Sequence, residues 1–188
     1  MRVLVVGEGR HEQRALPVLV RRLQTAATET PFDFVKNGRR VHRKGGGMFK
    51  KAVGWMLDAE FRRYDALVFL TDEDDDRSRR DQMEEAQAWG GSTLPRACGA
   101  AVPKFDAWFL ADEVALRAVL KVPVDRQPEP EQMRDPKHEC ERLLGKSEAG
   151  GSLGHLYEQV ARQADLATLS QRCKNGFAPF AERVRRLA

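Results

Sequence analysis

The chain has 188 residues, with 32 Lys and Arg against 28 Asp and Glu, so its formal net charge is +4 and its pI is about 9.1. A chain of this length can bury one sizeable core, and we expect a single domain with an appendage. Its three cysteines are odd in number and widely spaced, which argues against a disulfide framework and a cysteine zinc site. No apolar run is long enough to span a membrane or to serve as a signal peptide, so we expect a cytoplasmic protein.

The first predicted elements are a strand over residues 2–6, a Gly-Glu-Gly turn and a helix over residues 11–25. The turn is similar to the glycine fingerprint of dinucleotide-binding folds, but Glu12 stands in place of the third glycine. Glu8 in the turn would repel a pyrophosphate, so we expect no nucleotide cofactor. At a strand end, Glu8 can instead face acids that follow a neighbouring parallel strand.

A basic segment over residues 36–51 follows a short strand predicted over residues 33–35. The segment contains no acidic residue, and a loop of this kind can neutralise a phosphate backbone and release its counterions. The alternative is a solvated loop without a binding role. The candidate nucleic-acid-binding residues of the segment are Arg39, Arg40, Arg43, Lys44, Lys50 and Lys51.

The most informative stretch is an apolar strand predicted over residues 66–71, between helices predicted over residues 48–63 and 76–89. The strand runs directly into five consecutive acids, residues 72–76, and such close like charges repel one another by roughly a kcal/mol per pair even in water. A divalent cation would offset this repulsion, because alternate acids past a strand end can be directed at one point. The alternative is that an acid at the end of the run caps the following helix. The candidate metal ligands of the run are Asp72, Asp74 and Asp76.

A strand predicted over residues 97–102 and a helix over residues 113–120 continue the alternation of strands and helices. This alternation predicts an α/β fold with a mostly parallel four-stranded sheet and helices on both faces. After residue 122 the pattern changes to a proline-containing connection and then to helices. We therefore expect an α/β domain over residues 1–122 and a C-terminal helical extension over residues 123–188 that packs on the same core. The helices predicted in the extension span residues 136–144, 152–164 and 175–187.

Three segments of the chain resemble the Toprim pattern, in which a strand ending in Glu-Gly precedes a helix and a later strand ends in Asp-x-Asp. They are VVGEGRHE at residues 5–12, LVFLTDED at residues 67–74 and VPKFDAWFLAD at residues 102–112. The chain is similar in this respect to the Toprim domains of topoisomerases, primases and overcoming-lysogenization-defect nucleases. The third segment resembles a small Toprim-like family of uncharacterised bacterial proteins, in which the usual sequence of this motif is closer to IEAWLLAD. The resemblance implies a Toprim-like, Rossmann-like sheet.

The same resemblance implies a metal site built from carboxylates. It implies that Glu8 ligates a metal or acts in acid–base catalysis, and that Asp72 and Asp74 are ligands of Mg²⁺ or Mn²⁺. Asp106 stands where the family usually has Glu, and because Asp is one methylene shorter, a second metal site there is in question. Asp112 matches the family and is a further candidate ligand, or else it only starts the helix that follows.

Lys104 follows the fourth predicted strand and is a candidate to hold a scissile phosphate, although a solvated lysine before a helix is the alternative. Together with the resemblance, the candidate residues predict a Mg²⁺-dependent phosphodiesterase, a nuclease that acts on nucleic acid. Two alternatives stay open: a non-catalytic metal-binding, phosphate-binding or regulatory module, and a nucleotidyl-transfer enzyme. We expect no membrane partner, and the sequence does not distinguish a monomer from a homodimer or from a complex with another protein.

Overall fold

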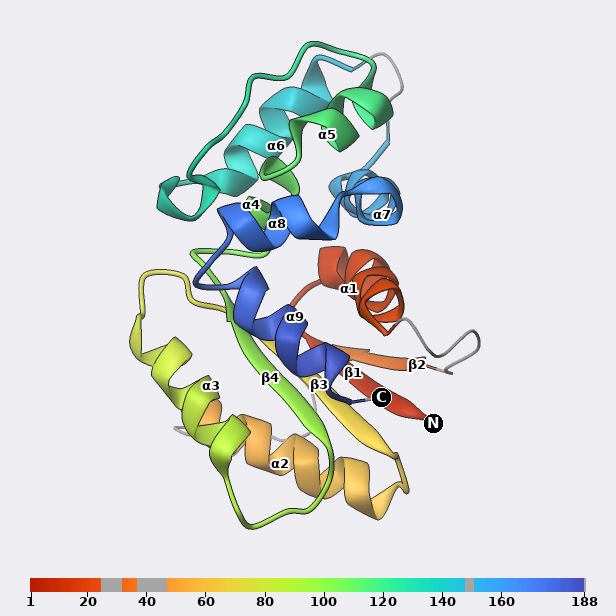
Figure 1. The fold of residues 1–188 in the computed structure, drawn as a ribbon, viewed down its shortest axis with the longest axis vertical. Coiled ribbons are helices and arrows are strands. Elements are labelled where there is room, and N and C mark those ends of the chain that lie inside the picture. The colour runs from red at the N-terminus through yellow and green to blue at the C-terminus, as the bar shows by residue number, and fades with distance from the viewer. Residues whose placement is uncertain (25–31, 37–46, 148–150, 188) are drawn as a thin grey trace.

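The computed structural model describes residues 1–24, 32–36, 47–147 and 151–187. Its centre is a sheet of four strands, all parallel, in the order β2-β1-β3-β4 (Figure 1). The α/β class and the four-stranded parallel sheet predicted from the sequence are confirmed. The strands are β1 (Val3–Gly7), β2 (Phe32–Lys36), β3 (Ala66–Asp72) and β4 (Arg96–Ala101).

Helices cover both faces of the sheet (Figure 1). One face is covered by α2 (Met48–Phe61) and α3 (Ser78–Ala88), and the other by α1 (Arg10–Leu23) and α9 (Phe177–Arg185). None of the helices in the described ranges is long and apolar enough to cross a membrane. A helical group between β4 and α9 lies above the sheet in Figure 1 and consists of α4 (Asp106–Leu110), α5 (Glu113–Leu120), the 3₁₀ helix η1 (Pro130–Gln132), α6 (Pro136–Gly145), α7 (Leu153–Gln163) and α8 (Leu166–Arg172).

Alternate residues of the central strand β1 face opposite sides of the sheet. Val3 and Val5 belong to the core cluster that α1 and α9 share, whereas Leu4 and Val6 belong to the cluster under α2 and α3. A parallel sheet covered on both faces needs apolar residues at every position of its strands. This is why β1 appears in the sequence as a continuous apolar run without alternating polar residues.

Two helices that follow residue 122 pack on the earlier part of the chain, α9 on the sheet and on α1, and α7 on α1. Phe180 of α9 lies so close to Gly99 of β4 that a Cβ at this glycine would be 2.9 Å from the phenyl ring. Arg183, one turn further along α9, donates a hydrogen bond to the backbone carbonyl of Cys98 at 2.6 Å. In addition, α7 packs along α1. As a result, residues from the second half of the chain come close to the ends of the first strands.

The structure differs from the predicted elements at several short segments. The sequence does not predict α4 and α8, because helices of five and seven residues give too short a periodic pattern. The predicted start of the last helix is wrong, since α9 begins only at Phe177. Glu131 accepts hydrogen bonds from the backbone N–H groups of Asn175 at 3.0 Å and Gly176 at 2.6 Å, and these bonds hold the preceding residues in a loop.

Candidate functional site

The ends of β1 and β3 bring Glu8 and Asp72 to one edge of the sheet. The two strands are adjacent and parallel, with Val6 opposite Phe69, so the residues that follow them lie at the same edge. Thr71 Oγ1, one residue before Asp72, donates a hydrogen bond to Glu8 Oε1. This hydrogen bond holds the Glu8 side chain against the end of β3.

Asp72 is anchored at this edge and surrounded by other acids. Its Oδ1 accepts a hydrogen bond from the backbone N–H of Phe105 at 2.7 Å, which ties the loop after β4 to the end of β3. Burial, followed by the negative charges of Glu12, Glu8 and Asp106, raises the pKa of Asp72 to about 8, although the Phe105 N–H favours the charged form. The edge therefore gathers more carboxyl groups than the surrounding protein can stabilise in their charged form.

Glu12 belongs to the same group of acids. In the sequence it is notable only because it replaces the third glycine of the dinucleotide-binding fingerprint. It lies in the first turn of α1 and is 8% exposed. Burial, and then the charges of Asp106 and Glu8, raise the pKa of Glu12, and its Oε2 has no hydrogen-bond partner among the described residues. Gly9 allows the approach, because a Cβ at this position would lie 2.5 Å from that oxygen. The sequence signal that could have identified Glu12 is a second acid in the helical turn that follows Glu8.

Asp106, the candidate for a second metal, is held by a tyrosine from α7. Asp106 is 7% exposed, and Tyr157 OH donates a hydrogen bond to its Oδ1. The tyrosine ring stacks on Phe109 with 4.3 Å between ring centroids, and the His11 ring meets it edge-on at 5.8 Å. Burial, followed by the nearby Cys140 and Asp106, raises the pKa of Tyr157, so its hydroxyl stays protonated and remains a donor.

Asp74 is directed toward cations of its own chain. Its Oδ2 accepts a hydrogen bond from Arg79 at 2.7 Å, and its Oδ1 lies 3.9 Å from Lys104 Nζ. Arg79 also donates to the backbone carbonyl of Asp72 at 3.0 Å, which closes the loop after β3. Asp74 has a φ of 52°, in the left-handed region that Asp tolerates better than most residues. Asp74 and Lys104 thus form a charged bridge between the loops that follow β3 and β4.

Two further candidate ligands, Asp76 and Asp112, lie at helix starts. Asp76 Oδ1 accepts hydrogen bonds from the backbone N–H and the hydroxyl of Ser78, at 3.1 and 2.6 Å, where α3 begins. Asp112 Oδ1 accepts from two backbone N–H groups of α5, and its Oδ2 accepts from the backbone N–H of Asp165 at 2.8 Å. Asp112 is the N-cap residue of α5, so its hydrogen bonds correspond to the helix-start alternative, whereas Asp76 lies one residue before Arg77, the N-cap of α3.

The structure describes only part of the predicted nucleic-acid-binding segment. Lys50 is exposed and Lys51 is partly exposed on the first turn of α2. Four other candidates of the segment lie outside the described residues: Arg39, Arg40, Arg43 and Lys44. Residue 25, at which the sequence predicts that the first helix ends, also lies outside them.

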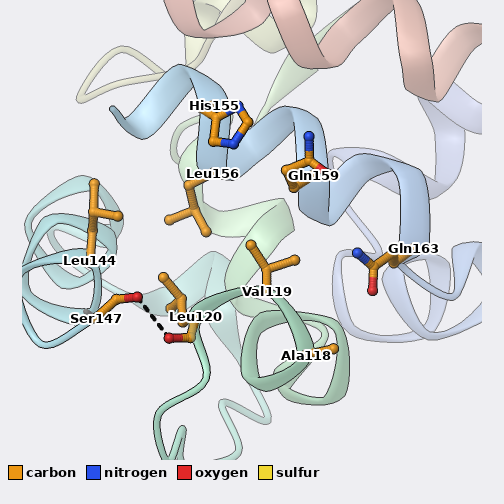
Figure 2. Close-up of a pocket in the computed structure, with 9 residues that line it drawn as sticks. All are labelled: Ala118, Val119, Leu120, Leu144, Ser147, His155, Leu156, Gln159 and Gln163. Carbon is orange, nitrogen blue, oxygen red and sulfur yellow. Dashed lines mark hydrogen bonds between the residues drawn. The ribbon is translucent and has the colours of Figure 1, made fainter. Parts of the chain in front are cut away.

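Two cavities are relevant to a binding site. A polar cleft of about 730 Å³, which we call the loop cleft, is lined by the loop between β3 and α3, by residues after β4, and by η1 with the residues that follow it. A smaller cavity of about 390 Å³ lies between α5, α6 and α7 (Figure 2). In its wall, Ser147 Oγ donates a hydrogen bond to the Leu120 carbonyl at 2.7 Å. None of the described residues that line this smaller cavity is a candidate acid, so the chemistry of the acids belongs to the sheet edge and the loop cleft.

Within the ranges that the structure describes, no three His, Cys, Asp or Glu side chains form a group that could hold a metal ion. Comparisons of the chain with protein-family models, with curated proteins and with solved structures found no match. The function therefore has to be inferred from the acids and their surroundings.

Proposed function

We propose that the protein is a Toprim-like, Mg²⁺-dependent phosphodiesterase that cleaves nucleic acid at the edge formed by Glu8, Glu12 and Asp72. The observation that carries the proposal is a group of mutually repelling carboxylates at the ends of adjacent parallel strands, where α/β proteins bind their ligands. Gathering like charges in a poorly solvated place costs free energy. Acids with strongly raised pKa values are typical of functional sites, where this cost is offset by a gain in activity.

The donor atoms of this edge suit a magnesium ion. Carboxylate oxygens are hard ligands, and Glu8 and Asp72 present them at the ends of two adjacent strands. Mg²⁺ is commonly held by one or two carboxylates together with water and substrate phosphates, so a cage of three protein side chains is not required. Glu8 and Asp72 would hold the ion, and Mn²⁺ would use the same oxygens. The bound ion would offset the charge of the scissile phosphate and lower the pKa of an attacking water.

The neighbouring groups of the chain position these acids. Thr71 Oγ1 keeps Glu8 in one orientation, and the Phe105 N–H does the same for Asp72. The Oε2 of Glu12 is the candidate to accept a proton from the attacking water, because no described donor satisfies it. Its raised pKa brings this carboxylate closer to neutral pH, where a general base works most effectively.

The resemblance to Toprim sites also suggests metal roles for Asp74 and Asp106, and each would have to leave a partner to take that role. Asp74 would have to leave Arg79, and Asp106 would have to leave Tyr157. Arg79 and Lys104 lie together at Asp74, which favours one second candidate function, a non-catalytic module in which a phosphate takes the place of the Asp74 carboxylate between these two cations.

Cleavage assays test the proposal. The purified protein should cut plasmid DNA, single-stranded DNA or RNA in Mg²⁺ or Mn²⁺ and should cut none of them in EDTA. Glu8→Gln and Glu12→Gln should each lower the cleavage rate by a factor of roughly a hundred or more, because each variant removes an oxygen ligand or a proton acceptor at nearly constant size.

Glu85→Gln is the matched control, because Glu85 is an exposed acid of α3 that lies outside both the group of acids and the loop cleft and should be dispensable. This variant should cleave at the wild-type rate. Binding of nucleic acid without cleavage under every metal would contradict the nuclease and support the non-catalytic module.

A further inference from the structure

The loop cleft has the size and position of a site for part of the substrate. Its lining begins at Glu73, the residue that directly follows Asp72 of the acid edge. Its volume of about 730 Å³ lies within the usual range of ligand pockets, roughly 300–1,000 Å³. Its walls come from segments that are far apart in the sequence, namely the loop after β3, the residues after β4 and the segment that contains η1.

Three arginines line the cleft: Arg77 and Arg80 from the β3–α3 loop and helix, and Arg134 from the segment after η1. The side chains of Arg77 and Arg134 form no ion pair or hydrogen bond with any residue that the structure describes. Arg80 Nε lies 3.5 Å from Glu73 Oε2. A guanidinium group can donate two parallel hydrogen bonds to a phosphate, so unpaired arginines of this kind favour a phosphate-bearing ligand.

The acids that line the cleft leave these arginines available. Glu131 is occupied by backbone N–H groups of the loop before α9, and Asp74 is paired with Arg79 and Lys104. Among the described acids of the cleft, Asp75 alone has neither an ion pair nor a hydrogen bond on its side chain. The two unpaired arginines therefore outnumber the unpaired acids.

Glu73 adds a hydrogen-bond acceptor to the cleft. It is 6% exposed, and its Oε2 has no hydrogen-bond partner among the described residues even though Arg80 lies nearby. A carboxylate oxygen in this situation can accept a hydrogen bond from a base amino group or a sugar hydroxyl. Val102, Pro103 and Met133 provide apolar surface in the same cleft, against which a base can pack.

We propose that the loop cleft binds one nucleotide of a nucleic-acid strand, next to the bond that the acid edge cleaves. Arg77 and Arg134 contact its phosphate, and Glu73 contacts its base or sugar. This inference rests on the proposed nuclease function and extends it to the path of the substrate. A free nucleotide carries the same phosphate, sugar and base, so the experiment has to distinguish a nucleotide within a strand from a free nucleotide.

Fluorescence anisotropy in EDTA measures binding without cleavage, with a short labelled single-stranded oligonucleotide as the probe. The cleft variant, Arg77→Ala with Arg134→Ala, should bind about tenfold more weakly or worse. The slope of log K against log salt should flatten by about 0.7, since both arginines contact the same phosphate and each phosphate neutralised on a single strand contributes about 0.7. The control variant, Lys146→Ala with Arg185→Ala, removes two exposed cations outside the cleft and should keep the wild-type slope. Equal losses in the two variants would overturn the proposal.

Glu73→Met tests the contact to the base or sugar, because it removes the acceptor at nearly the same side-chain length. Removing a negative charge from the cleft would by itself tighten the binding of a polyanion. A severalfold loss of affinity therefore indicates a lost hydrogen bond, whereas tighter binding would overturn this role of Glu73.

Competition with a nucleoside 5′-monophosphate separates the two sources. If the monophosphate displaces the probe only at concentrations far above those of unlabelled oligonucleotide, the result supports a strand as the ligand. Displacement at equal concentrations would overturn the proposal of a strand in favour of a free nucleotide. Cleavage in Mg²⁺ separates this inference from the proposed function. If the wild-type protein cleaves and the cleft variant keeps its kcat/KM, the cleft is excluded as a substrate site and the nuclease function stands. If the wild-type protein binds through the cleft and never cleaves, the nuclease function is excluded and the binding site stands.

Discussion

At the scale of single residues, the acids of the sheet edge differ in the partners that surround them. Asp74 and Asp112 are satisfied by cations or by backbone N–H groups, so their charge is compensated within the protein. Glu12 is buried and Asp72 is half-buried beside other acids, and the pKa of each is raised. Acids of this second kind lower the stability of the folded protein at neutral pH and are the ones a cation or substrate can relieve.

Asp72 should make the stability of the protein depend on pH. Its pKa rises from 3.8 in the unfolded chain to about 8 in the folded protein, so between these values the folded state holds a proton that the unfolded state has released. The contribution of Asp72 is therefore most favourable below about pH 4 and is lost as the pH rises toward 8. Asp72→Asn keeps an acceptor for the Phe105 N–H, and it should raise the free energy of unfolding at about pH 9 by several kcal/mol, because each pKa unit corresponds to about 1.4 kcal/mol.

Urea unfolding in EDTA at a series of pH values measures this effect, with Asp75→Asn as the exposed control. The control should follow the wild-type pH profile. A wild-type stability that stays level across the same range would show that Asp72 is not protonated in the folded state.

The sequence predicts Glu8 and Asp72 at one edge because each follows an apolar run that forms a strand of the same parallel sheet. It does not predict the burial of Glu12, nor its closeness to Asp72 and Asp106, which lie far along the chain. The pairing of Asp74 is missed for a similar reason. Lys104 reaches it from the loop after another strand, and no local pattern records that contact.

At the scale of elements, fully buried strands and the longer amphipathic helices are visible in the sequence because each carries its own periodic pattern. The short helix α4 is not visible, although it positions Asp106 and, just before it, the Phe105 N–H. The fit between elements is equally hidden, since it depends on pairs such as Gly99 of β4 and Phe180 of α9.

Gly99→Ala tests that fit. The new methyl group would lie 2.9 Å from the Phe180 ring, so the variant should lower the free energy of unfolding by about 1–3 kcal/mol through overpacking. Gly145→Ala is the matched control at the end of α6, where a Cβ would meet no atom within 4 Å and should be neutral or slightly stabilising. Chemical denaturation compares the two variants, and equal stabilities would contradict the tight contact of α9 with β4.

At the scale of the whole molecule, the net charge of +4 hides an uneven distribution, because uncompensated acids gather at one edge of a basic protein. Long-range attraction would bring a polyanion to the molecule, while the acids would keep its phosphates away from the edge until a cation is present. Under the proposed function, the metal therefore governs the approach of the substrate as well as the chemistry.

Millimolar Mg²⁺ or Mn²⁺ should accordingly raise the Tm of the wild-type protein. A ligand that binds only the folded state stabilises it by mass action, by about 2.7 kcal/mol at a concentration of 100 times Kd. Glu8→Gln and Asp72→Asn should lose most of this response, and Asp75→Asn should retain it. Differential scanning fluorimetry over a metal titration measures the shift, and a wild-type Tm that does not change would remove the metal from the proposed function.

During synthesis, β1 with Glu8 and β3 with Asp72 emerge from the ribosome before α7 and α9. Tyr157 cannot hold Asp106, and the face of the sheet that α9 covers cannot close, until those later helices have emerged and packed. A nascent chain therefore carries its acids in a solvated, incompletely ordered edge. Under the proposed function, the site is therefore complete only after α7 and α9 have packed.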